Sequence, residues 1–295
     1  MLLFHRLGWE DKDTVRRYVG ESPLSYFQFS NMYMWRRVMN YRICEEDGIL
    51  YVTERYRDHP TGAFLPFGAE GREEMAIARL RESLDGPLRL RPLSEEQARR
   101  VASLFPEGRM IEKRGQWDYL YRASDLSTLP GRHYHGKRNH ISAFYAAHPT
   151  CVYHGIGEHA TAQEMDLLRR ALDRLSPREG QDLSEEYEAN LDLIDHFTEL
   201  SLRGGVLSID GTPVACTVGE QITSSMALIH IEKADRDCRG AYPAINQAFV
   251  QNTFSHLALI NREEDMGIEG LRRAKESYRP VDFNRVYAVE LPPLR

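Results

Sequence analysis

The chain has 295 residues, of which 42% are hydrophobic and 28% charged, and its net charge at pH 7 is -6. This length favours two domains with separate cores, and the composition excludes a predominantly disordered protein. The acidic balance argues against a broad electrostatic grip on nucleic acid, and we expect no DNA partner. No apolar run approaches the roughly 20 residues that span a bilayer, and the N-terminus does not resemble a secretory signal, so we expect a cytoplasmic protein.

Cysteine and histidine spacing gives no sign of a metal centre. The four cysteines, which are far apart in the chain, are Cys44, Cys151, Cys216 and Cys238. They form no Cys-x-x-Cys pair, which excludes a zinc ribbon and a thioredoxin-like site. His133, His135 and His140 lack a carboxylate or cysteine pair at ligand spacing. We therefore expect no metal and no required cofactor.

Short strands alternate with helices from residue 1 to about residue 125. Strands are expected at 42–43, 49–53 and 63–67, and helices at 10–19, 73–83 and 94–103. The aromatic segment 26–37 is expected to be a buried helix, because aromatic side chains bury large areas; a pocket wall is the alternative. This alternation predicts an α/β layer structure.

A stretch punctuated by Pro and Gly, at 125–131, separates the two halves and precedes a predicted helix at 132–148. We place the domain boundary here, with residues 1–127 as the N-terminal domain and residues 128–295 as a linker helix plus the C-terminal domain. Lys137, Arg138 and Asn139 lie at this junction, a usual place for a substrate cleft. Alternatively, the two cations pair with the acidic helix expected at 179–199, which has no Lys or Arg.

The second half is more regular. Strands expected at 205–209 and 212–218 flank Asp210-Gly211, a strong hairpin signal. The elements expected after the hairpin are a strand at 225–231, a helix at 242–254, a strand at 257–260, a helix at 268–278 and a closing strand at 285–291.

This order of elements resembles the C-terminal half of a GNAT acyltransferase. In that family the helix that holds the donor's pyrophosphate begins with the pattern Arg/Gln-x-x-Gly-x-Gly/Ala. Free amides at the start of a helix favour phosphate. The matching window is Arg239-Gly240-Ala241-Tyr242-Pro243-Ala244. Arg239 and Ala244 fit the pattern, whereas Tyr242 stands at the central glycine. Its side chain is expected to obstruct the seat used by coenzyme A.

Candidate acid and base residues follow from the same comparison. GNAT enzymes use a tyrosine at the end of the next helix to protonate the leaving group, so the resemblance implies that Tyr278 is the general acid. Glu232 and Asp235 follow the central strand, and either carboxylate is placed to act as a base; we rank Glu232 first. The alternative is that they pair with Lys233 or Arg236.

Nearly the whole chain resembles the DUF2156 family. The resemblance rests on segments 26–37, 121–122 through 129–131, 137–140, 239–246 and 261–278. This family is grouped with the C-terminal domain of phosphatidylglycerol lysyltransferase and is related in fold to Fem-type aminoacyltransferases. It implies an α/β (α+β) fold of two tandem GNAT-like domains, each a mixed sheet flanked by helices. The N-terminal copy has no phosphate-binding window and is expected to be non-catalytic.

Substrate-binding candidates gather at the joints between elements. They are Lys137, Arg138, Asn139, Arg239, Gly240, Tyr242, Asn246, Asn261, Arg262, Glu263, Asp265, Arg272 and Lys275. The group at 261–265 follows a strand at the carboxyl end of a sheet, where ligands bind, although a capped turn is the alternative. Arg272 and Lys275 can hold a phosphate or carboxylate from one side of their helix, or are solvated.

The resemblance implies an acyl or aminoacyl transferase that works by direct displacement. Its expected donor is aminoacyl-tRNA, and its expected acceptor is a lipid headgroup or another cell-envelope precursor reached by peripheral membrane contact. Two alternatives stay open. One is an N-acyltransferase that uses an acyl-CoA donor, and the other is a non-catalytic GNAT-fold binding module that holds a small metabolite or a partner.

Overall fold

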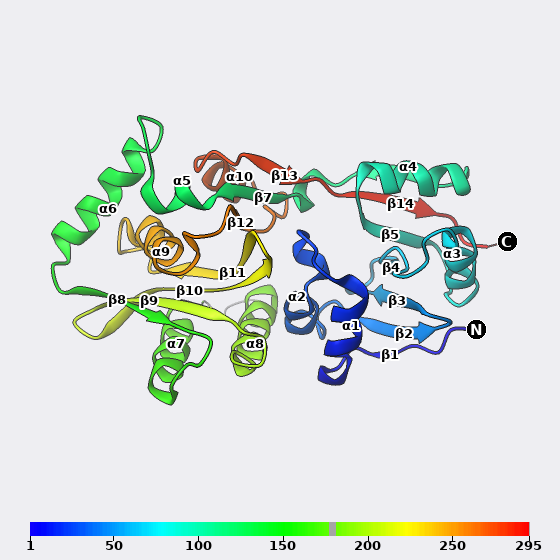
Figure 1. Ribbon diagram of the computed structural model, residues 1–295, viewed down its shortest axis with the longest axis horizontal. Helices are drawn as coiled ribbons and strands as arrows, with labels where there is room; N and C mark the ends of the chain where they lie inside the picture. The colour runs from blue at the N-terminus through cyan, green and yellow to red at the C-terminus, as the bar shows by residue number, and fades with distance from the viewer. Residues whose placement is uncertain (177–180, 295) are drawn as a thin grey trace. The chain divides into compact units, whose positions relative to one another are not determined.

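The chain forms two compact units in a computed structural model that describes residues 1–176 and 181–294. Unit 1 comprises Met1–Trp117, Glu264–Ile268 and the chain from Asn284 onward, and unit 2 comprises Asp118–Glu263 and Glu269–Phe283. Within the described residues each unit holds one seven-stranded mixed sheet (Figure 1). The predicted α/β class with two mixed sheets flanked by helices is therefore confirmed. No helix in these residues is long and apolar enough to cross a bilayer.

Unit 1 carries its sheet in the order β1-β2-β3-β4-β5-β14-β6, and only the β4–β5 pair is parallel. Its strands are β1 (His5–Arg6), β2 (Arg42–Glu46), β3 (Ile49–Glu54), β4 (Gly62–Ala63), β5 (Leu88–Leu93), β6 (Arg109–Glu112) and β14 (Tyr287–Leu291). Its helices are α1 (Lys12–Val19), α2 (Phe29–Met34), α3 (Glu73–Glu82) and α4 (Glu95–Leu104), with the 3₁₀ turns η1 (Trp9–Asp11), η2 (Ser25–Phe27) and η3 (Arg114–Gln116). The side chain of Ser94 caps α4 by accepting a hydrogen bond from the amide of Gln97.

Unit 2 repeats this sheet order as β8-β9-β10-β11-β12-β7-β13, with β11 and β12 as the parallel pair. Its strands are β7 (Asp118–Arg122), β8 (Cys151–Ile156), β9 (Arg203–Ile209), β10 (Thr212–Thr223), β11 (Met226–Ala234), β12 (Leu259–Asn261) and β13 (Asp282–Asn284). Its helices are α5 (Ala123–Thr128), α6 (His135–Ala147), α7 (Ala162–Leu175), α8 (Gln181–Asp195), α9 (Ala241–Phe249), the π-helical η4 (Val250–Phe254) and α10 (Glu269–Glu276). Figure 1 shows α9 on one side of these strands and α7 and α8 on the other.

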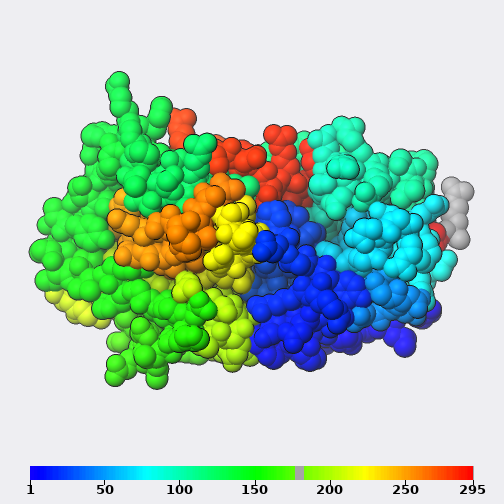
Figure 2. Space-filling model, viewed as in Figure 1, coloured from blue at the N-terminus to red at the C-terminus, as the bar shows by residue number. Residues whose placement is uncertain are grey.

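The sixth strand of each sheet comes from the other half of the sequence. β14 pairs with β5 and β6 in unit 1, whereas β7 pairs with β12 in unit 2. β14 contacts α4, and Figure 2 shows red residues near the C-terminus beside the blue-green residues of the α4 region. Unit 2 therefore begins at Asp118, before the boundary predicted at 127/128, and the strand predicted to close the second half joins the first sheet. Burial explains this placement, because Val289 and Leu291 of β14 lie in the core of unit 1.

Most of the predicted elements of the second half are confirmed. The hairpin turns at Asp210-Gly211, with Ile209 paired to Thr212, and α9 and α10 lie where helices were predicted. The strand predicted at 63–67 is wrong beyond Ala63, since only an isolated bridge joins Phe67 to Leu50. The acidic helix predicted at 179–199 is seen as α8, and its first two residues lie outside the described part of the chain.

Truncating the buried end of β14 should destabilise the protein. Leu291 is 1% exposed in the core of unit 1, so Leu291→Ala should lower the free energy of unfolding by about 3 kcal/mol. The matched control is Leu294→Ala, whose side chain is exposed, and it should cost less than about 0.5 kcal/mol. Urea-induced unfolding measures both; equal values for the two variants would contradict the placement of β14.

Candidate active site

Two neighbouring strands part in the middle of the sheet of unit 2. β11 and β12 pair only from Met226 to Leu228, opposite Leu259 to Asn261. Beyond that point β11 continues to Ala234, while the other chain turns away and the amide of Arg262 bonds to the carbonyl of Tyr119 on β7. Side chains of β11 that follow Leu228 thus lack a neighbouring strand on one side. A gap at this position can admit a ligand between polar side chains.

A β-bulge in β11 lies at the edge of this gap. Val218 pairs with Ile231 and Gly219 pairs with Ile229, so His230 is the extra residue on its strand. Gly219 is required here because a Cβ would lie 2.5 Å from the carbonyl oxygen of Leu228. The bulge changes which side chains of β11 point to each face of the sheet. Bulges commonly redirect side chains next to functional sites.

The gap opens into a cleft of about 580 Å³ within unit 2. This volume lies within the usual range of roughly 300 to 1,000 Å³ for small-molecule sites. Predicted site residues that line the cleft are Lys137, Glu232, Tyr242, Arg262, Glu263, Lys275 and Tyr278. They come from α6, β11, the start of α9, the loop after β12, and α10 with the turn that follows it.

Arg262 forms an ion pair with Glu232 at the wall of the cleft. The guanidinium Nη2 lies 2.5 Å from Oε1 of Glu232, and the two side chains are only 12% and 14% exposed. The other carboxylate oxygen accepts a hydrogen bond of 2.8 Å from Asn246. Burial lowers the pKa of Arg262, but the negative charge of Glu232 outweighs it and keeps the guanidinium charged. Since both oxygens of Glu232 are engaged, its geometry suits a positioning role better than that of a base.

The ring of Tyr278 lies between two cations. Nζ of Lys137 is 3.9 Å from the ring centroid, and the guanidinium carbon of Arg262 is 4.7 Å from it. The hydroxyl of Tyr134 holds the backbone by donating a 2.8 Å hydrogen bond to the carbonyl of Tyr278. Burial raises the pKa of the Tyr278 phenol well above its usual value, against the opposing charge of Arg262. The phenol is therefore protonated at neutral pH, as a proton donor must be.

Lys137 extends from α6 into the same cleft. Burial, followed by the positive charge of Arg262, lowers the pKa of Lys137 to about 8, and Glu232 opposes this shift. The ion pair considered for Lys137 and Arg138 with the acidic helix is not found in the described residues. The described partners of α8 include Lys233, which pairs with Glu186, and Arg169, which pairs with Asp195.

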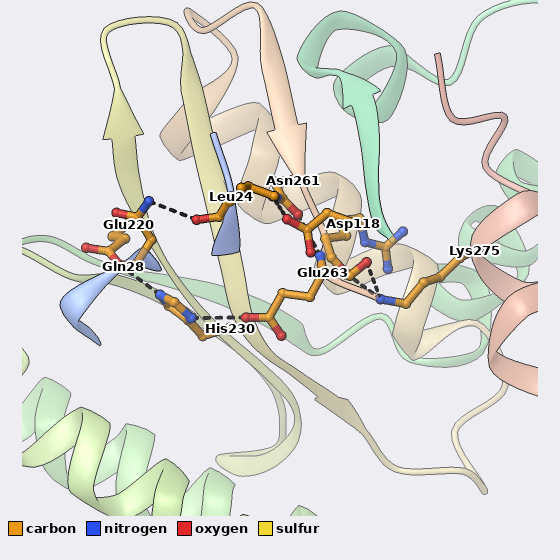
Figure 3. A network of polar contacts seen from close by, with 9 residues as sticks. Leu24, Gln28, Asp118, Glu220, His230, Asn261, Glu263 and Lys275 are labelled. Atoms are coloured by element: carbon orange, nitrogen blue, oxygen red, sulfur yellow. Dashed lines mark hydrogen bonds and ion pairs between the residues drawn. The ribbon is translucent and has the colours of Figure 1, made fainter. Parts of the chain in front are cut away.

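His230, which lines the cleft, lies between two carboxylates (Figure 3). Its Nε2 is 3.0 Å from Glu220, and its Nδ1 is 3.2 Å from Glu263. Burial lowers the pKa of His230, but the hydrogen bonds and charges of the two carboxylates outweigh burial and raise it to about 9. The imidazole is therefore charged at neutral pH and holds Glu263 against β11.

Polar side chains hold the loop after β12 in place through hydrogen bonds, several of them to the backbone. Buried Asn261 donates to Asp118 at 2.8 Å and accepts the amide of Glu263 at 2.8 Å. Lys275 donates to the carbonyl oxygens of Arg262 and Glu263 (Figure 3). Asn261 and Lys275 therefore shape the wall that presents Arg262.

Several other candidates have structural roles away from the cleft. Arg138 donates to the carbonyls of Leu129 and Gly131, and Asn139 bonds to His135 on the surface of α6. Asp265 is buried in unit 1, where it pairs with Arg114 and accepts the amide of Gly267.

The candidates in and around α9 also include residues that do not line the cleft. Gly240 has φ +96°, and a Cβ there would lie 2.4 Å from the carbonyl oxygen of His140 on α6. The close approach of α6 therefore explains why this position is a glycine. Arg239 is exposed, Asn246 is buried behind Glu232, and half-buried Arg272 on α10 is not among the described lining residues.

Sequence reasoning missed His230 and did not include Lys233, Arg236 and Glu186 among the site residues, although all four line the cleft. A signal for His230 existed, because this histidine interrupts the apolar run from Met226 to Ile231. The bulge that places His230 between Glu220 and Glu263 could not be read from the sequence. Asp235, the second candidate base, is 2.6 Å from Arg174.

Comparisons with known proteins agree with this architecture. Residues 20–290 match the family described as phosphatidylglycerol lysyltransferase, C-terminal. A conserved protein of unknown function from Bacteroides thetaiotaomicron is 30% identical, with 99% of this chain and 100% of that one covered and a TM-score of 0.85. No curated protein matches the chain.

Two more distant structures share the fold. The C-terminal domain (DUF2156) assigned to a lysylphosphatidylglycerol synthetase of Agrobacterium fabrum is 14% identical, with 95% of this chain and 91% of that one covered and a TM-score of 0.66. A tandem GNAT protein from the clavulanic acid biosynthesis pathway is 11% identical, with 100% and 99% covered and a TM-score of 0.54. The predicted tandem GNAT architecture is confirmed.

Removing the carboxylate of Glu232 should be costly. Glu232→Gln leaves the buried charge of Arg262 without its partner and should lower the free energy of unfolding by about 3 kcal/mol. Adding Arg262→Met should restore much of this loss, because the unpaired charge is then gone. The control is Glu269→Gln in an exposed pair with Arg273, which should cost less than about 0.5 kcal/mol in urea unfolding. Equal costs for the two single variants would contradict an organising role for Glu232.

Stability should fall at alkaline pH because of His230. Its folded-state pKa of about 9 lies above the ordinary value of 6.5, so its contribution is complete below pH 6.5 and is lost as pH rises through 9. The expected loss is on the order of 3 kcal/mol, measured as unfolding free energy against pH. His230→Gln should flatten this slope, whereas the exposed His256→Gln should keep it. An unchanged slope in His230→Gln would assign the pH dependence to other groups.

Proposed function

The chain belongs to the phosphatidylglycerol lysyltransferase C-terminal family, and from this we propose that its unit 2 cleft transfers an acyl or aminoacyl group to an acceptor amine or hydroxyl. Family and fold are those of acyltransferase-type proteins. The observation that carries the proposal is the parting of β11 and β12 beside Tyr278. It leaves room for a donor carbonyl next to one protonated phenol and one buried guanidinium.

Direct displacement needs little covalent chemistry from the protein. The acceptor attacks the donor carbonyl carbon, and Tyr278 donates its proton to the leaving oxygen or sulfur. Arg262 supplies positive charge where the carbonyl oxygen becomes negative. Its Nη1 is buried and has no hydrogen-bond partner among the described residues, so it retains donor capacity at the cleft wall. Glu232 and Asn246 hold this guanidinium in place.

We favour aminoacyl-tRNA as the donor and a lipid headgroup or other cell-envelope precursor as the acceptor. Tyr242 lines the cleft and is 42% exposed at the position where GNAT enzymes seat a pyrophosphate. A side chain there disfavours coenzyme A, and an aminoacyl ester of tRNA presents no pyrophosphate to it. Exposed Arg236 lines this end of the cleft and can contact a polyanionic donor.

Unit 1 is proposed to be the non-catalytic copy. Its parallel pair, β4 and β5, is followed directly by Phe64, whose ring packs edge-to-face on Phe27 and Phe67. Nearby, the buried carboxylate of Glu54 pairs with Arg91 and lies where a Cβ on Gly62 would be. Side chains thus pack beside the parallel pair of unit 1.

Donor binding and turnover test the proposal together. Isothermal titration should show micromolar binding of aminoacyl-tRNA and none of coenzyme A, and transfer should be followed with a labelled aminoacyl group. Tyr278→Phe should lower kcat by roughly 10²- to 10⁴-fold with little change in donor binding. Tyr145→Phe, at a tyrosine of α6 that is not among the cleft-lining residues, is the control.

The other outcomes separate the alternatives. Binding of coenzyme A, with transfer from an acyl-CoA, would replace the proposed donor. Binding without transfer from either donor would favour a binding module. Full turnover in Tyr278→Phe would overturn the role of Tyr278.

A further inference from the structure

Lys137 differs from the other enclosed cations of the cleft in its contacts. Lys233 pairs with Glu186 at 2.7 Å, Arg262 pairs with Glu232, and Lys275 donates to backbone carbonyls. Lys137 has neither an ion pair nor a hydrogen bond with any residue that the structure describes, although its side chain is partly buried. Its amine lies over the Tyr278 ring at the cleft, within the electrostatic influence of Arg262 and Glu232.

The carboxylates that face this volume are already engaged. Glu232 binds Arg262 and Asn246, Glu263 binds His230, and Glu186 binds Lys233. A carboxylate in a strong ion pair is a poor proton acceptor, because protonation must break that pair. Lys137 combines access to the cleft with freedom from such a pair. With a pKa of about 8, roughly one-tenth of its amine is neutral at pH 7.

We infer that Lys137 is the general base that takes the proton of the acceptor during transfer. This inference rests on the proposed acyl-transfer function. As the acceptor nitrogen or oxygen forms its bond to the carbonyl carbon, its proton passes to the neutral amine of Lys137. The bond from that carbon to the leaving oxygen or sulfur then breaks, and the leaving atom takes the proton of Tyr278.

The same pair of residues can return to its starting state without a further reagent. After transfer, Lys137 is an ammonium and Tyr278 is a phenolate. Their proximity, with Nζ 3.9 Å from the ring centroid, lets one proton move from the ammonium to the phenolate through a bridging water. The phenolate is stabilised meanwhile by Arg262 on the same ring. Protons and charge therefore balance over one turnover.

A titration of the amine tests the inference without any substrate. Reductive ¹³C-methylation labels the lysines, and Lys137→Arg identifies the resonance of Lys137 in the spectrum. We expect this resonance to titrate near pH 8. A midpoint above pH 10 would overturn the role of Lys137 as a base, and it would leave the proposed function standing.

The pH dependence of turnover tests the same role in the reaction. The wild type should lose kcat/KM below about pH 8. Lys137→Arg keeps the positive charge but should lower kcat at least 100-fold, abolish that limb and leave donor binding within a few-fold. Lys113→Arg, at a partly buried lysine of unit 1 whose pKa is also lowered by burial, is the matched control and should keep the wild-type profile.

The outcomes distinguish the two proposals. If Lys137→Arg keeps both the rate and the acidic limb while Tyr278→Phe is impaired, the base is elsewhere and the transferase function survives. If donor binding is lost together with turnover in Lys137→Arg, Lys137 is a binding residue and the inference fails. An inactive wild type with either donor overturns both proposals.

Discussion

The cleft of unit 2 is organised by one buried ion pair, between Arg262 and Glu232. Arg262 occupies the space where β11 and β12 separate, and a charge in that position is tolerated only because a carboxylate of the neighbouring strand neutralises it. The guanidinium in turn sets the electrostatics of its surroundings. It stacks on Tyr278, opposes the protonation of Lys137 and fixes Glu232 in a state that is of little use for proton transfer. Acid, base and anchor are thus parts of one electrostatic arrangement.

A second set of polar contacts holds these groups in position. The bulge at His230 turns its imidazole toward Glu220 and Glu263, and Lys275 holds the backbone that carries Arg262. These groups contribute position more than chemistry. Rigid positioning of this kind is the main resource of an enzyme that works by direct displacement.

Local sequence patterns predicted the helices and strands well, but they could not predict which distant strands pair. The Asp210-Gly211 hairpin and α9 and α10 follow from turn residues and helical periodicity, which depend on neighbours in sequence. Tyr278, Lys137 and Arg262 were selected through the family resemblance, and the structure brings them together. The bulge at His230 was not predictable, because it depends on how β10 pairs with β11. The same is true of the strands that each sheet takes from the other half of the chain, because their pairing joins residues that are far apart in the sequence.

That reciprocal use of strands constrains how the protein is made. The sheet of unit 2 needs nothing beyond Asn284, and its first strand, β7, is already present when residue 122 has been synthesised. The sheet of unit 1 needs β14 between β5 and β6, so it stays incomplete until residues 287–291 leave the ribosome. The half of the sequence that is translated first therefore finishes folding last, and until then an open slot between two of its strands must be kept from pairing with other chains.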